Sequence, residues 1–222
     1  MKSFKQHILE KLKVSVRNTT KHTLFPKTKD ELKEMIKYEI SKNGNKCSLN
    51  HIDVSEITDM SNIFYMSSFN GDISNWDVSN VRDMKYMFSY SKFNGDISDW
   101  DVSSVMDMNG MFAYSNFNED ISEWDVSSVI DMNGMFEQSK FNGDISNWDV
   151  SNVTDMSFLF YNSKFNGNIS NWNVSSVQDM SRMFNGSKFN GDISNWDVSS
   201  VTDMTRMFNR SPLENNPPKW YK

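Results

Sequence analysis

Phe-Asn-Gly-Asp-Ile-Ser-Asn-Trp-Asp-Val-Ser-Asn-Val, residues 69–81, decides the fold of this chain, because nearly the same phrase returns every 24 residues. The later copies open at Phe93, Phe117, Phe141, Phe165 and Phe189. Tryptophan keeps the same period from Trp76 to Trp220. A fixed period of this length is typical of a repeat array in which each unit buries its apolar face only against its neighbours. The sequence therefore predicts one elongated domain with atypical units at its ends.

Two apolar periods follow one another within each unit. Over residues 69–74 apolar and polar residues alternate, which predicts a short strand with one face inward. Over residues 81–88 the apolar residues recur at i, i+3, i+6 and i+7, which predicts a short helix, and Asn80 with Asp83 would form its capping box. Asp77, in the corner between them, is suited to an Asx-turn. We therefore expect an α/β solenoid of strand-turn-short-helix coils with a concave strand face; an all-β solenoid is the alternative.

Two columns of large apolar residues fix the register of the coils. One begins at Met60 and the other at Phe64, and both recur at the 24-residue period through Met204 and Phe208. Methionine and phenylalanine at this spacing could line a cofactor site, but their presence in every unit favours core packing. We expect no cofactor.

The chain before the repeats predicts two helices. Thr28 and Glu31 form a capping box that opens a capping helix over residues 28–44, and Asn43-Gly44 supplies its stop. Residues 1–27 predict an N-terminal helix and a linker. The solenoid of seven repeats would then occupy residues 45–222, with Pro217 and Pro218 blunting its last edge.

Charge is divided unevenly along the chain, whose net charge is −6. Residues 1–50 hold 12 basic and 5 acidic residues, a net charge of +7, and residues 51–222 hold 11 and 24, a net charge of −13. A basic head could contact nucleic acid, but its lysines form no clustered motif and carry no interleaved aromatics. We favour a solvated helical cap attracted to its own acidic repeats, and expect no nucleic-acid partner.

The sequence shows no cysteine pair, no long apolar stretch and no recognisable secretion signal. Cys47 is the single cysteine, so an intramolecular disulfide framework is excluded. No stretch has the roughly 18 apolar residues of a membrane span. We see no signal peptide or lipobox, which by sequence favours a cytoplasmic or virion-associated location but leaves the compartment open. The oligomeric state is left open.

The phrase Ile-Ser-Asn-Trp-Asp-Val-Ser-Asn-Val-Thr-Asp-Met-Ser, followed by Met-Phe or Leu-Phe, resembles the BspA-like leucine-rich repeat family, whose repeats also occur in mycoplasma and Listeria surface proteins. The resemblance covers residues 49–207. It implies a right-handed leucine-rich-repeat-like solenoid, a role in adhesion or protein binding at microbial surfaces, and no catalytic residues. The head, with Phe-Pro-Lys-Thr-Lys-Asp-Glu-Leu at residues 25–32, is similar to leaders of phage or prophage copies.

A non-enzymatic binding, adhesion or structural scaffold is the function that we expect, with a protein or glycan as its partner. One candidate surface is the strand face, where polar residues recur in register: Asn70, Asp72, Ser74, Asn94, Asp96, Asn142, Asp144, Asn190 and Asp192. A uniform acidic face suits a repeating ligand such as a glycan, but asparagine ladders that stabilise the stack explain it better.

The second candidate surface is the helix side, where the units differ from one another. Tyrosine and arginine are typical interface anchors. The varied positions hold Tyr86, Tyr90, Tyr114, Phe158, Tyr161, Arg182 and Arg206.

Two other classes of function have weaker signals. Calcium-dependent adhesion would use recurring loop aspartates such as Asp72 and Asp77, but the unit matches no known calcium loop and turn roles already explain these residues. A glycosidase would need a singular carboxylate pair, whereas every aspartate here recurs. We therefore expect no enzyme.

Overall fold

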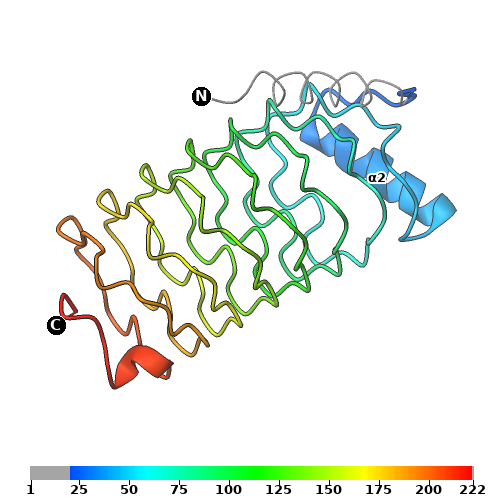
Figure 1. The fold of residues 1–222 in the computed structure, drawn as a ribbon. Coiled ribbons are helices and arrows are strands. Elements are labelled where there is room, and N and C mark those ends of the chain that lie inside the picture. The colour runs from blue at the N-terminus through cyan, green and yellow to red at the C-terminus, as the bar shows by residue number, and fades with distance from the viewer. Residues whose placement is uncertain (1–20, 222) are drawn as a thin grey trace, which may run out of the picture.

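The protein is a stack of coils, seen in a computed structural model that describes residues 21–221. Figure 1 shows the coils side by side in a row, from helix α2 at the N-terminal end to the C-terminal segment. We number the coils by their 24 residues: coil 1 is residues 45–68, coil 2 is 69–92, and so on to coil 7, residues 189–212. Within the described residues the regular elements are α2 (Lys29–Asn43) and the short 3-10 helix η1 (Pro212–Glu214).

One of the segments that join neighbouring coils we call the turn face: residues 83–91 in coil 2 and the equivalent residues of every other coil. Its amides alternate between two kinds of acceptor. The amides of Tyr86 and Phe88 donate to carbonyls of the next coil at 2.8 and 2.9 Å, whereas the amides of Met87 and Ser89 donate to carbonyls three residues back. The turn face is thus a parallel ladder made of successive turns.

The short helix expected in every coil is wrong, because the backbone of the turn face cannot be helical. A helix needs donation from each amide to the carbonyl four residues earlier and right-handed dihedrals throughout. Here Tyr86 has φ 53° and Tyr90 has φ 56°, both left-handed. The predicted capping box also fails: the Asp83 carboxylate accepts from the amide of Lys85, two residues on, at 2.8 Å.

The strand expected over residues 69–74 is wrong as well, so neither the α/β solenoid of leucine-rich-repeat type nor the all-β alternative is the fold. Within residues 21–221 the parallel pairing is confined to isolated bridges 24 or 28 residues apart, and no sheet forms. An Asx-turn at Asp72, whose carboxylate accepts from the Ser74 amide at 3.0 Å, ends the extended backbone at once. Without a sheet on one side and helices on the other, the predicted concave strand face has no basis.

The predicted apolar columns do form the core. The tryptophans from Trp76 to Trp196 and the methionines from Met60 to Met180 are buried. So are the phenylalanines of the column from Phe64 to Phe208 and those that open the repeats from Phe69 to Phe189. Rings of successive coils lie parallel, as at Phe88 and Phe112, with centroids 5.6 Å apart. Phe88 also stacks on Phe93, at 4.4 Å. One continuous aromatic core therefore runs through the stack.

Helix α2 closes the N-terminal end of the core, as its capping box predicts. The Thr28 side chain accepts from the Glu31 amide, and Gly44 ends the helix at φ 83°. Leu32 and Ile36 are buried against the core. The first predicted helix lies outside the described residues.

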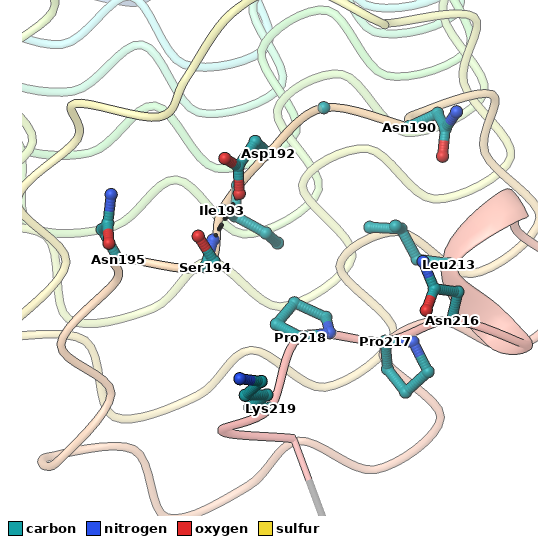
Figure 2. A pocket seen from close by; sticks show the side chains of 11 residues that line it. Asn190, Asp192, Ile193, Ser194, Asn195, Leu213, Asn216, Pro217, Pro218 and Lys219 are labelled. Atoms are coloured by element: carbon teal, nitrogen blue, oxygen red, sulfur yellow. Dashed lines mark hydrogen bonds between the residues drawn. The ribbon is translucent and has the colours of Figure 1, made fainter.

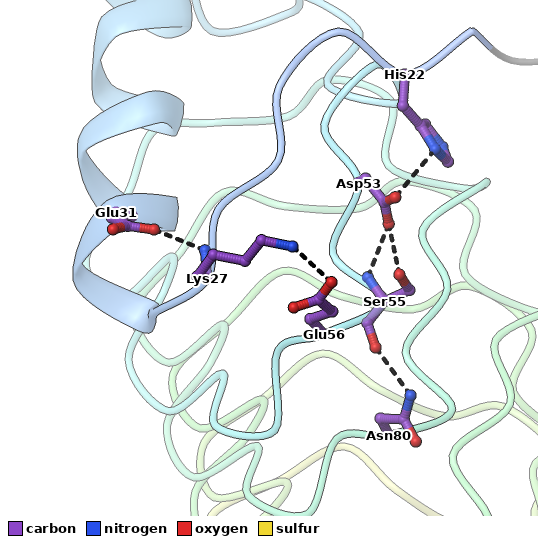
Figure 3. Close-up of polar contacts among 7 residues, drawn as sticks. All are labelled: His22, Lys27, Glu31, Asp53, Ser55, Glu56 and Asn80. Carbon is purple, nitrogen blue, oxygen red and sulfur yellow. Dashed lines mark hydrogen bonds and ion pairs between the residues drawn. The ribbon is translucent and has the colours of Figure 1, made fainter.

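Basic residues of the head are paired with acidic residues of coil 1, as the division of charge suggests. Figure 3 shows Lys27 reaching Glu56, while His22 lies 3.5 Å from Asp53. Lys29 pairs with Asp59 at 3.0 Å. Asn80 extends the network to coil 2 by donating to the Ser55 carbonyl at 2.8 Å.

Candidate functional site

The first candidate surface, which we now call the polar face, consists of residues 70–74 of coil 2 and their equivalents. Its asparagines form a ladder between coils. The side-chain oxygen of Asn70 accepts from the backbone amide of Asn94 at 2.8 Å, and this bond repeats through Asn118, Asn142, Asn166 and Asn190. These oxygens replace the carbonyls of a strand ladder and hold the coils together.

The aspartates of the polar face close turns within their own coil. Asp96 accepts from the backbone amide of Ser98 at 3.0 Å and from its hydroxyl at 2.7 Å. These hydrogen bonds lower the pKa of Asp96, and the same bonds lower the pKa of Asp144 and Asp192. Coil 6 keeps the geometry with an amide, since Asn168 accepts from Ser170 at 3.0 Å. Asp77 makes the predicted Asx-turn to Ser79 at 3.1 Å. Each of these residues has a local structural role.

The aspartates are not gathered into a metal-binding group. In the part of the chain that the structure describes, no three His, Cys, Asp or Glu side chains converge as metal ligands would. The structure adds no support to the calcium hypothesis, which stays untested.

The second candidate surface falls on the turn face, and its varied residues share one backbone property. Each turn face from coil 1 to coil 7 has two left-handed residues four positions apart, with φ between 48° and 68°. The first column holds Asn62, Tyr86, Gly110, Gly134, Phe158, Arg182 and Arg206; the second holds Met66, Tyr90, Tyr114, Gln138, Asn162, Gly186 and Arg210. Of the predicted residues, Tyr161 alone lies outside these columns, one position before Asn162. The sequence analysis did not include the glycines of these columns. Glycine at positions that hold tyrosine or arginine in other coils could have indicated a left-handed backbone there.

Tyrosines gather on the turn face of coils 1 to 3. The rings of Tyr90 and Tyr114 are stacked with centroids 4.3 Å apart, and Tyr65 meets Tyr90 edge-on at 6.1 Å. With Tyr86 they line a hollow of about 570 Å³. Tyr90 is 47% exposed and Tyr65 is 44% exposed, so aromatic surface is open to solvent.

Glu137 borders this tyrosine cluster. Its carboxylate accepts from the Tyr114 hydroxyl at 2.7 Å, and that hydroxyl accepts from Gln138 at 2.9 Å. Burial, Glu137 and Tyr90 raise the pKa of Tyr114 above its ordinary value. The cluster also attracts cations, because the Lys85 ammonium lies 5.6 Å from the Tyr86 ring centroid.

Arginines occupy the other end of the same columns. The Arg182 guanidinium lies 5.2 Å from the ring centroid of Phe158 in the preceding coil. Arg206 and Arg210 of coil 7 are exposed. The turn face thus changes from aromatic to cationic along the stack.

Two further hollows were not predicted. Met106 and Ile130, each 41% exposed, lie in a shallow groove of about 580 Å³ beside Arg82 and Thr154. Figure 2 shows the other, of about 530 Å³, between residues 190–195 and the C-terminal segment with Pro217 and Pro218.

One known protein family matches the repeats of this chain. The family described as "Mycoplasma protein of unknown function, DUF285" matches at residues 30–142, 90–164 and 137–221. The chain belongs to this family. Searches of curated proteins and of solved structures found no match.

Membership in DUF285 confirms a mycoplasma-type repeat protein and brings no function with it. The matched segments extend from α2 to the C-terminal segment, so they include every turn face. Across residues 21–221, no helix is both long and apolar enough to cross a membrane.

Proposed function

We propose that this DUF285 protein is a non-enzymatic repeat scaffold that binds a partner through its turn face. The tyrosine cluster carries the proposal. A left-handed backbone conformation at a non-glycine residue is unfavourable by about 1–2 kcal/mol. Tyr86, Tyr90 and Tyr114 all have this conformation. Coils 3 and 4 have glycine at the first of these positions, so the coil itself does not need a tyrosine there.

Residues held in such conformations concentrate where a protein binds its ligands. Tyrosine is also among the residues that dominate the free energy of protein association. The stacked rings of the exposed Tyr90 and the partly buried Tyr114 supply rigid contact area, and Glu137 and Gln138 supply a polar border.

The polar face is the weaker candidate, because its hydrogen-bonding groups already serve the stack. Asn70 and its equivalents bind the next coil, and Asp72 and its equivalents bind their own turns. A glycan-binding role for this face has no observation beyond exposure to support it.

Adhesion at a microbial surface, which the resemblance to BspA-like repeats implies, is one setting that such a scaffold would suit. A phage or prophage setting, suggested by the head sequence, is another. Either would use the turn face in the same way.

Selection of displayed random peptides tests the proposal. The probe library is panned on the immobilised chain, on Tyr90→Ala with Tyr114→Ala, and on Asn147→Ala, an exposed residue away from the turn face. We expect enriched peptides whose binding falls at least tenfold with the tyrosine variant and is unchanged with Asn147→Ala. Equal binding to all three proteins, with unchanged melting midpoints, would refute a binding role for this face.

A further inference from the structure

We propose that the partner of the turn face is a second copy of this chain, docked face to face and antiparallel. This inference rests on the proposed function and names its partner. It is argued from the order of residues along the two left-handed columns: tyrosines lie in coils 2 and 3, arginines lie in coils 6 and 7, and coils 4 and 5 between them hold Gly134, Gln138, Phe158 and Asn162.

The geometry of such a pair follows from the repeat. When two identical stacks face each other in opposite directions about a two-fold axis, each column lies opposite the same column and the order of coils is reversed. Because both copies have the same spacing of about 4.8 Å between coils, all the pairs come into register together. An axis between coils 4 and 5 sets coil 2 against coil 7, coil 3 against coil 6, and coil 4 against coil 5.

In this register the cations of one copy meet the tyrosines of the other. Tyr86 lies opposite Arg206, and Tyr90 lies opposite Arg210. A guanidinium over an aromatic ring is favourable by about 0.5–2 kcal/mol in general. The chain already shows this contact between adjacent coils of the same column, at Phe158 and Arg182.

Residue size is complementary in the same register. Phe158 lies opposite Gly134, and Gln138 lies opposite Asn162. Tyr114 lies opposite Gly186, where the Asn162 side chain of the same chain already fills the space beside the glycine. The absence of a side chain at Gly134 leaves real space, since an added Cβ would have no atom nearer than 3.5 Å within its own chain. In the neighbouring column, Tyr161 lies opposite Glu137, a hydroxyl donor opposite a carboxylate.

Two competing arrangements are less favourable. In a parallel pair, coil 7 of one copy would face coil 7 of the other, so Arg206 and Arg210 of the two copies would face each other. An antiparallel pair shifted by one coil, with its axis through coil 4, would set Glu137 against Glu137. Like charges face each other in both, which is destabilising.

Charge exchange between two variants tests the pairing, with sedimentation equilibrium of the full chain as the measurement. We expect the wild-type protein to be a dimer at tens of micromolar. Tyr90→Lys and Arg210→Glu, each alone, should weaken the dimer at least tenfold, while their equimolar mixture should recover it as a heterodimer. The heterodimer has one Lys–Glu contact and one native Tyr90–Arg210 contact, so both of its halves are attractive.

The matched control is Asn147→Lys, which adds the same charge at an exposed position outside the turn face and should leave the dimer intact. Melting midpoints are measured first; if Arg210→Glu unfolds the chain beside Glu214, the pair Tyr86→Lys and Arg206→Glu replaces it. A wild-type monomer throughout the concentration range overturns this inference, and so does a mixture that stays monomeric. Neither result touches the proposed function, because peptide selection requires no self-association.

Discussion

The indole nitrogen of Trp100 donates a hydrogen bond to the main-chain carbonyl of Ile73 in the preceding coil, at 3.2 Å. The same carbonyl accepts from the amide of Trp76 at 3.1 Å, so it closes a turn in its own coil and anchors the next one. This bond repeats at every tryptophan of the column, from Trp76, which donates to the Leu49 carbonyl at 3.0 Å, to Trp220, which donates to the Ile193 carbonyl at 2.9 Å. The tryptophan column therefore joins the coils by hydrogen bonds as well as by burial.

Replacing Trp100 with phenylalanine should destabilise the protein by about 1–3 kcal/mol. The variant loses one hydrogen bond and part of a buried ring, and the remaining space cannot collapse between two ordered coils. Urea unfolding followed by circular dichroism measures the loss. Trp220→Phe is the matched control, because Trp220 is only partly buried; an equal loss at both positions would contradict the argument.

The asparagine ladder predicts a difference between the middle and the end of the stack. Asn118→Ala removes the acceptor of the Asn142 amide and should cost about 0.5–1.5 kcal/mol. Asn190→Ala should cost almost nothing, because the amide 24 residues later, that of Glu214, donates to Ser211 instead. Thermal melting of both variants checks the difference. Equal costs would mean that the ladder contributes no stability.

The sequence was sufficient to predict the period, the buried columns and the capping helix, but not the backbone inside a coil. Apolar residues at 81, 84, 87 and 88 fit a helix and a chain of turns equally well, since both bring every third or fourth residue inward. The deciding property is the sign of φ at residues such as Tyr86. A positive φ is easy to predict at glycine but hard to predict where tyrosine or arginine occupies the same position.

The candidate site was likewise predicted without knowledge of the backbone conformation. The varied residues Tyr86, Tyr90, Tyr114, Phe158, Arg182 and Arg206 were selected because they differ between coils. Their shared left-handed geometry, and the inclusion of Gly110, Gly134 and Gly186 in the same columns, required the fold. The asparagine row was predicted to stabilise the stack, but its bonding of side-chain oxygen to backbone amide was not.

Replacing a turn-face arginine that has a left-handed backbone should raise the stability of the monomer and weaken the dimer. Arg206 has φ 57° and an exposed side chain. Arg206→Gly should stabilise the monomer by about 0.5–1 kcal/mol, since glycine adopts this conformation without strain but loses more freedom on folding. The dimer should weaken at the same time. Arg206→Ala is the control: it removes the side chain and keeps the strain, so it should weaken the dimer without raising the melting midpoint.

Stacked aspartates on the turn face predict that Asp107→Asn stabilises the protein at neutral pH. Burial and the neighbouring Asp131 and Asp83 raise the pKa of Asp107, against the opposing effects of the Asn109 amide and Lys85. A carboxyl whose pKa is raised in the folded state contributes stability below its unfolded pKa and loses it as pH rises through the folded pKa. Ionised Asp107 is therefore unfavourable at pH 7, and removing its charge should gain about 0.2–1 kcal/mol, the general size of a side-chain pair interaction between neighbouring strands.

Asparagine can keep the turn at this position, because Asn168 and Asn173 already accept the same bonds in coil 6. The gain should disappear below about pH 4, where the wild-type carboxyl is protonated. Asp144→Asn should show the opposite sign: hydrogen bonds from Ser146 lower the pKa of Asp144, so its ionised form stabilises the fold at pH 7 and that stability is lost as pH falls through its folded pKa. Melting midpoints of both variants at pH 7 and pH 3 decide the matter, and a loss of stability in Asp107→Asn at pH 7 would show that the column of carboxylates is not repulsive.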